Sequence, residues 1–160
     1  MSIELSSEER RLYDEVTKFV QDEVRRLGGG AGNVLPLITL QREVCSSAIA
    51  AAVTLEKMMF QARSPELTER LAGLRDLALA TRANSKADYL ERLIRETGDK
   101  VIVFTEYRAT QEYLLKFFKD RDFPAVPYRG GMNRGRKDWM MDLFRSRAKV
   151  LVATEAGGEG

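Results

Sequence analysis

The first part of the chain repeats apolar side chains at the spacing of an amphipathic helix. In the first such stretch the apolar positions are Leu12, Val16, Phe19, Val20, Val24 and Leu27. Ser6 and Glu9 precede it with the spacing of a capping box, so a helix is expected over residues 7–27. The glycine-rich residues 28–33 follow. They have neither the preceding strand nor the Gly-Lys-Ser/Thr of a phosphate-binding loop, and are expected to form a flexible connector.

Three further helices are expected before the pattern changes. The second is expected to start near Pro36, since proline is favoured in the first turn of a helix, and its apolar side continues to Met58. Its small residues 45–47 are expected to pack in the interior. The third covers residues 64–80, and the fourth covers residues 85–97 and is closed by a glycine. The first part of the chain is therefore expected to be entirely helical.

From about residue 100 the apolar pattern alternates between strands and helices. Buried strands are expected at residues 101–104, 124–128 and 150–153, with amphipathic helices over 109–122 and 133–145. This β-α-β-α-β order implies parallel strands and right-handed crossovers. The third strand precedes the end of the chain, so we expect it to lie at the edge of the sheet or to require a partner that covers it. The fold class is α/β: a helical segment followed by a truncated parallel sheet.

Polar residues and glycines follow each expected strand. Residues 105–108 follow the first strand, residues 129–131 the second, and Thr154 with the glycine loop 155–160 the third. Because the carboxyl ends of parallel strands meet at one edge of a sheet, these residues are expected to form one rim. Its hydroxyls, arginines and backbone N–H groups suit phosphate binding. They include no nucleophile–base pair and no metal cluster, so the residues alone predict a phosphate-binding half-site without catalysis.

Composition narrows the class of protein. The chain has 160 residues, of which 44% are hydrophobic and 31% charged, as in soluble globular domains. The absence of histidine and the single cysteine, Cys45, exclude histidine general-base chemistry, an internal disulfide and ordinary zinc sites for this chain alone. There is no apolar run of membrane-spanning length and no signal-peptide pattern. We therefore expect a cytoplasmic protein with no membrane partner.

Charge is unevenly spread along the chain. The net charge is only +2, yet residues 129–149 hold seven basic residues against two acidic ones. This basic segment is typical of a surface that faces the phosphates of a nucleic acid. It is more often the solvated face of a helix, and charge alone leaves both interpretations open.

Three segments resemble motifs of the second helicase superfamily, in the form used by Swi/Snf-type double-stranded DNA translocases. Residues 100–114 resemble motif IV, residues 128–144 look like the glycine turn and arginine-to-phenylalanine helix that follow it, and residues 150–160 are similar to motif V. Their order, separation and position at the ends of expected strands make the resemblance specific. The upstream helices resemble the segment that joins the two motor lobes in bacterial members.

The resemblance implies one part of an ATP-driven motor in which two RecA-like lobes hold ATP and magnesium between them. Residues 1–84 would be a helical linker or protrusion, and residues 85–160 the N-terminal part of the second lobe. Its partners would be double-stranded DNA and the first RecA-like lobe of the same parent chain. The residues implied to contact the DNA backbone are Thr105, Tyr107, Arg129, Arg134, Arg136 and Thr154. The residues implied to shape the turn at the ATP cleft are Gly157, Gly158 and Gly160.

The resemblance also implies what this segment lacks. The Walker A lysine and the magnesium-binding motif would belong to the first lobe, and the arginine finger of motif VI would lie beyond Gly160. The parent protein would hydrolyse ATP and this chain alone would not. We expect Gly160 to be an artificial or proteolytic end, and the loop 155–160 to be mobile or ordered by a neighbouring molecule.

Two other functions are compatible with the residues. One is a stand-alone nucleic-acid-binding or protein-interaction module without motor activity, which a reading frame that truly ends at Gly160 would favour. The other is a small flavodoxin-like nucleotide-binding enzyme. The missing strands and the absence of an acidic or aromatic cofactor signature disfavour the enzyme.

Overall fold

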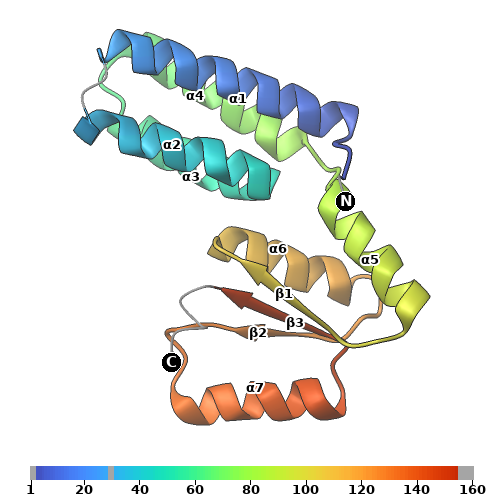
Figure 1. Ribbon diagram of the computed structural model, residues 1–160. Helices are drawn as coiled ribbons and strands as arrows, with labels where there is room; N and C mark the ends of the chain where they lie inside the picture. Colours follow the sequence, from blue (N-terminus) through green and yellow to red (C-terminus); the bar gives the residue numbers. More distant parts are fainter. Residues whose placement is uncertain (1–2, 29–30, 155–160) are drawn as a thin grey trace. The chain divides into compact units, whose positions relative to one another are not determined.

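The computed structural model describes residues 3–28 and 31–154, without the side chains of residues 31–33. The chain divides into two compact units, Met1–Ser85 and Lys86–Gly160. Within the described residues the first unit is made of four helices, drawn in blue to green in Figure 1. They are α1 (Ser7–Arg26), α2 (Ala31–Ser46), α3 (Ala48–Gln61) and α4 (Pro65–Ala80).

The four helices enclose one apolar core. Helix α1 packs against α2 and α4, and α3 packs against the same two helices. The largest fully buried residues of this core are Leu12, Phe19, Leu40, Leu55 and Leu71. Burying one such side chain stabilises the fold by about 1.5–3 kcal/mol. The helical prediction for this unit is confirmed.

The capping box predicted at the start of α1 is confirmed. The Ser6 hydroxyl accepts a hydrogen bond from the Glu9 backbone N–H at 3.2 Å, and the Glu9 carboxylate accepts one from the Ser6 N–H at 2.9 Å. Glu9 also accepts from the backbone N–H of Ser85 at 2.9 Å and from its hydroxyl. Burial raises the pKa of the Glu9 carboxyl, but the hydrogen bonds from Ser85 and Ser6 outweigh it, so the pKa is lowered.

The second predicted helix is wrong in two respects. It is two helices, because the chain is extended at Ser47, whose side chain accepts a hydrogen bond from the Ala50 N–H and caps α3. It also begins before Pro36, which lies inside α2, so the connector is shorter than the glycine-rich residues 28–33. Proline favours a helix start without excluding helical residues before it. Cys45, which was expected to pack, is exposed.

The second unit is a sheet with helices on both faces. Helix α5 (Ser85–Thr97) leads into β1 (Val101–Thr105), α6 (Arg108–Lys119), β2 (Ala125–Tyr128), α7 (Arg134–Ser146) and β3 (Val150–Thr154). Gly98 ends α5 with φ of 68°, as predicted for a glycine C-cap. The three strands pair in parallel in the order β1-β3-β2.

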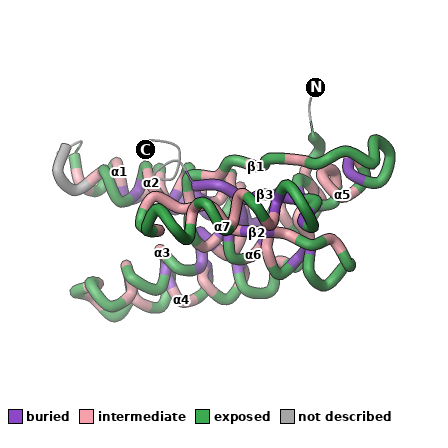
Figure 2. Tube along the Cα trace, turned by 90° about the horizontal axis from the view of Figure 1, so that it is seen from below, coloured by how far each residue is buried: buried purple, intermediate pink, exposed green. Residues whose placement is uncertain are grey.

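The prediction that the third strand lies at an edge is wrong. Strand β3 lies between β1 and β2 and pairs with both, and all five of its residues are buried (Figure 2). The connection from β1 to β2 leaves space for one strand between them, and the connection from β2 places β3 in that space. The order of elements along the chain does not reveal this, because both arrangements satisfy right-handed connections.

The two faces of the sheet pack against different helices. Val150 and Val152 face the core formed with α5 and α6, whereas Leu151 and Ala153 face α7. Helices α6 and α7 lie on opposite sides of the sheet (Figure 1). Helix α7 packs on β2 and β3, and Ile102 and Phe104 of β1 remain exposed. None of the described helices is both long and apolar enough to span a membrane.

Candidate nucleic-acid interface

The carboxyl ends of the strands and the starts of α6 and α7 form one rim of the second unit (Figure 1). Thr105 and Thr154 are direct partners at the ends of β1 and β3. The Thr105 hydroxyl accepts a hydrogen bond from the backbone N–H of Tyr107 at 3.3 Å, and Tyr107 is the N-cap residue of α6. Three of the predicted DNA-contacting residues are therefore brought together. The Thr154 side chain is buried.

Arg129 lies at the same rim, directly after β2, and is held by two neighbours on α6. Its Nε donates a hydrogen bond to Oε1 of Gln111 at 2.6 Å. Its Nη2 lies 3.8 Å from the carboxylate of Glu112. The Arg129 side chain is 25% exposed, so it remains accessible to a ligand while its position is constrained.

Arg134 and Arg136 stand in the first turn of α7. The side chain of Asn133 caps this helix by accepting a hydrogen bond from the Arg136 N–H at 2.9 Å. The first turn contains no acidic residue, both arginines are exposed, and their guanidinium groups bond to no residue that the structure describes. A helix dipole disfavours a cation at this end by about 0.3–1 kcal/mol. A bound phosphate would reverse that cost, since it is attracted both to the arginines and to the helix end.

The basic segment 129–149 does not form one continuous surface. Its later members lie at the other end of α7, where Arg145 is 3.7 Å from Asp142. There the Lys149 ammonium donates to the carbonyl of Gly98 at 2.8 Å. Only the earlier members, with Arg129, Arg134 and Arg136 among them, lie near the carboxyl ends of the strands.

The acidic side chain of Glu112 lies among the cations of the rim. Glu112 on α6 accepts a hydrogen bond from Nε of Arg108 at 3.0 Å and is the carboxylate near Arg129. Both Arg108 and Glu112 are largely exposed, so this pair is worth at most a few tenths of a kcal/mol. A phosphate could displace Glu112 from Arg129 at little cost.

Gln111 is a rim residue that sequence reasoning missed. It is fully buried on α6, where its amide contacts β2, β3 and Arg129. The sequence could have identified Gln111 by its position. It falls on the same helical face as Leu114 and Phe118, where an apolar residue would be expected. A buried amide requires hydrogen-bond partners, but the sequence does not say which.

The residues implied to face ATP, Gly157, Gly158 and Gly160, lie outside the described residues, as does the loop 155–160. Within the described ranges no group of three or more Cys, Asp or Glu side chains could hold a metal ion.

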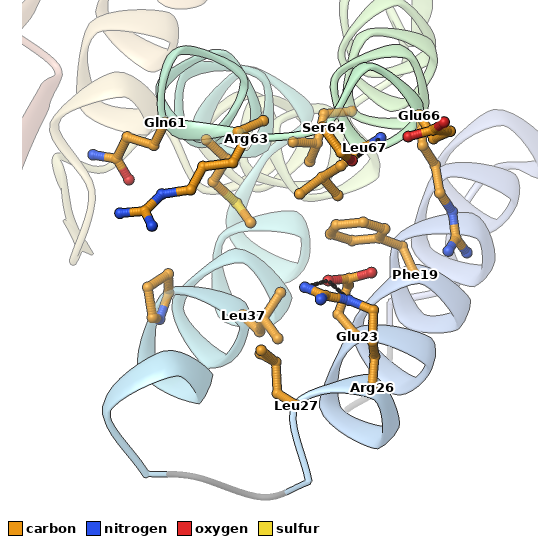
Figure 3. Close-up of a pocket in the computed structure, with 15 residues that line it drawn as sticks. Phe19, Glu23, Arg26, Leu27, Leu37, Gln61, Arg63, Ser64, Glu66 and Leu67 are labelled. Carbon is orange, nitrogen blue, oxygen red and sulfur yellow. Dashed lines mark hydrogen bonds and ion pairs between the residues drawn. The ribbon is translucent and has the colours of Figure 1, made fainter.

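The first unit contains a cavity of about 770 Å³, shown in Figure 3. Phe19, Leu37 and Leu67 form apolar parts of its wall. Arg26, beside them, is ion-paired with the buried Glu23 at 2.8 Å. None of the residues predicted to bind nucleic acid is among those that line this cavity.

Known sequences resemble either the second unit alone or nearly the whole chain. The family described as "Helicase conserved C-terminal domain" matches residues 85–160. A Bacillus subtilis (strain 168) protein described as "Uncharacterized ATP-dependent helicase YqhH" is 45% identical over 161 residues, which cover 99% of this chain and 28% of that protein. The ATP-dependent RNA helicase DBP2 of Candida albicans is 26% identical over 73 residues, 45% of this chain and 13% of its own length. This chain thus spans less than a third of either relative.

Two solved structures share the fold. The crystal structure of the Pyrococcus furiosus Hef helicase domain superposes with a TM-score of 0.65 at 17% identity, over 98% of this chain and 45% of that one. The C-terminal part of the Fun30 ATPase domain gives a TM-score of 0.59 at 15% identity, over 100% of this chain and 69% of that one. These similarities confirm the predicted fold class, a helical segment followed by a partial RecA-like sheet.

Proposed function

We propose that this chain is part of an ATP-dependent helicase-like motor of the second superfamily. Residues 85–160, which match the helicase C-terminal domain, form the N-terminal part of its second RecA-like lobe, and residues 1–84 form the helical linker or protrusion. The similarity of nearly the whole chain to an ATP-dependent helicase supports this assignment. The first lobe of the same parent protein is the partner that completes the ATP cleft.

Within this motor the rim of the second unit binds the nucleic-acid backbone. The observation that carries this proposal is the position of Arg129, Arg134 and Arg136 at the carboxyl ends of the strands, with no acidic residue in the first turn of α7. Guanidinium groups and helix N-terminal N–H groups both favour phosphate. Contacts to phosphates fix the position of a protein on a duplex without reading its sequence.

The specific substrate we propose is double-stranded DNA, as in Swi/Snf-type translocases. RNA is the second candidate, since the DBP2 relatives are described as RNA helicases. Competition binding with the 160-residue chain separates the two. Duplex DNA should compete better than duplex RNA of the same sequence, and two unrelated DNA duplexes should compete equally. Stronger competition by duplex RNA would identify RNA, not DNA, as the substrate. A marked preference for one DNA sequence would contradict binding to the nucleic-acid backbone.

ATP and magnesium are the cofactors of the parent protein in this proposal, and Gly157, Gly158 and Gly160 lie on the turn that faces them. The chain alone should not hydrolyse ATP, because it lacks the Walker A lysine and the acidic magnesium-binding motif of a first lobe. Phosphate release measured with and without duplex DNA tests this. Hydrolysis by the purified chain that DNA stimulates would contradict the proposal.

A further inference from the structure

Gln111 ties three parts of the rim together. Its Nε2 donates to the backbone carbonyl of Val152 in β3 at 2.7 Å and to that of Tyr128, the last residue of β2, at 3.3 Å. Its Oε1 accepts the hydrogen bond from Arg129 at 2.6 Å. Each polar atom of the amide is thus used, and the side chain has no exposed surface.

The short bond to Arg129 fixes the guanidinium through its Nε. The Nη groups do not take part in that bond, and one of them lies near Glu112 at 3.8 Å, a distance at which the attraction between exposed charges is weak. An arginine already held in one orientation loses less side-chain entropy when it binds a phosphate. Arg134 and Arg136, in contrast, have no described partner that would hold them.

We propose that Gln111 is a positioning residue for nucleic-acid binding, which holds Arg129 at the rim with its Nη groups available to a backbone phosphate. This inference rests on the proposed function of the rim. Because the same amide is hydrogen-bonded to the backbone of β2 and β3, the orientation of Arg129 is tied to both of these strands.

The alternative is that Gln111 only stabilises the sheet. The two roles differ in how Gln111 and Arg129 depend on each other. If Gln111 acts through Arg129, removing the amide should have little further effect once Arg129 is gone. If it only joins strands, its removal should lower the stability of the unit whether or not Arg129 is present, and should leave binding by the folded protein unchanged.

A double-mutant cycle tests the inference with the variants Gln111→Met, Arg129→Ala and their combination. Gln111→Met keeps the volume of the side chain and removes both amide functions. We expect each single change to weaken duplex DNA binding by about fivefold to tenfold and to reduce the salt dependence by about one phosphate contact. The combined variant should be no weaker than Arg129→Ala. Leu114→Ala, which removes buried surface on the same helix without touching Arg129, controls for lost stability.

A second readout does not depend on binding. The Nε–H proton of Arg129, observed by NMR, should exchange slowly with solvent in the unaltered chain and rapidly in Gln111→Met. If Gln111→Met does not fold, Arg129→Lys is used in its place. This variant keeps the charge but loses the planar group that Gln111 holds, so it should bind DNA nearly as weakly as Arg129→Ala.

The outcomes separate this inference from the proposed function. Absence of duplex binding by the unaltered chain would overturn both. Binding that is unchanged in Gln111→Met, additive effects of the two substitutions, or full affinity in Arg129→Lys would overturn the positioning role alone.

Discussion

At the scale of single residues, Glu43 is buried on α2 with one carboxylate oxygen that accepts no hydrogen bond from the described residues. Burial raises the pKa of this carboxyl, and the hydrogen bond from Thr54 and the charge of Lys57 offset only part of the effect. A group whose pKa is higher in the folded state stabilises the fold fully below its unfolded pKa. That stability is lost as the pH rises through the folded pKa.

Glu43→Gln should therefore stabilise the chain at neutral pH and have little effect in acid. We expect the free energy of unfolding to rise by about 1 kcal/mol near neutrality, because the buried charge is removed. The gain should vanish below about pH 4, where the carboxyl is protonated in both states. Urea unfolding at several pH values measures this, with the exposed Glu66→Gln as control. A gain of equal size at every pH would show that the charge of Glu43 is not its cause.

At the scale of elements, the end of α7 is closed by a lysine from a distant part of the sequence. The Lys100 ammonium donates to the carbonyl oxygens of Phe144, of Arg145 at 2.8 Å and of Ala148 at 3.2 Å. The last carbonyls of a helix have no partner within it, and the helix dipole favours a cation there. Lys100 precedes β1, so this contact joins the helix to the amino end of the sheet.

Lys100→Met should destabilise the second unit by about 1–2 kcal/mol, because it keeps the aliphatic part of the side chain and removes the charged donor. Chemical denaturation followed by the fluorescence of Trp139, the single tryptophan, reports on α7 directly. Lys116→Met is the matched control, since Lys116 is exposed and forms a local ion pair with Asp120, the C-cap residue of its own helix. Equal losses in the two variants would mean that the carbonyl contacts add nothing.

The types of the elements could be predicted from sequence, because the apolar period and the caps of each are local. The capping box of Ser6 and Glu9 and the glycine end of α5 are examples. The break at Ser47 could not, because Ser47 stands between residues that continue the helical pattern, and its capping role requires an extended backbone at that residue. Contacts such as that of Lys100 join residues more than forty positions apart, and spacing along the chain does not indicate them.

At the scale of the whole molecule, the rim was predictable because parallel strands place their carboxyl ends together. Its detailed organisation was not. Strand β3 is central because it pairs with strands on both sides, and Gln111 forms hydrogen bonds with three partners that are distant in sequence. The basic segment 129–149 is one run in sequence, but α7 separates its two ends in space. The charge of the segment therefore identifies the basic surface of the rim only when the position of α7 is known.

This separation provides the most direct test of backbone binding at the rim. Two paired substitutions remove the same charge from opposite ends of α7: Arg134→Ala with Arg136→Ala, and Arg145→Ala with Arg147→Ala. Binding of mixed-sequence duplex DNA to the 160-residue chain is measured by fluorescence anisotropy over a series of salt concentrations. The first pair should weaken binding strongly and reduce the salt slope by about two phosphate contacts, whereas the second should leave both nearly unchanged. Equal losses from the two pairs, or full binding without Arg134 and Arg136, would contradict the assignment of the rim as the nucleic-acid interface.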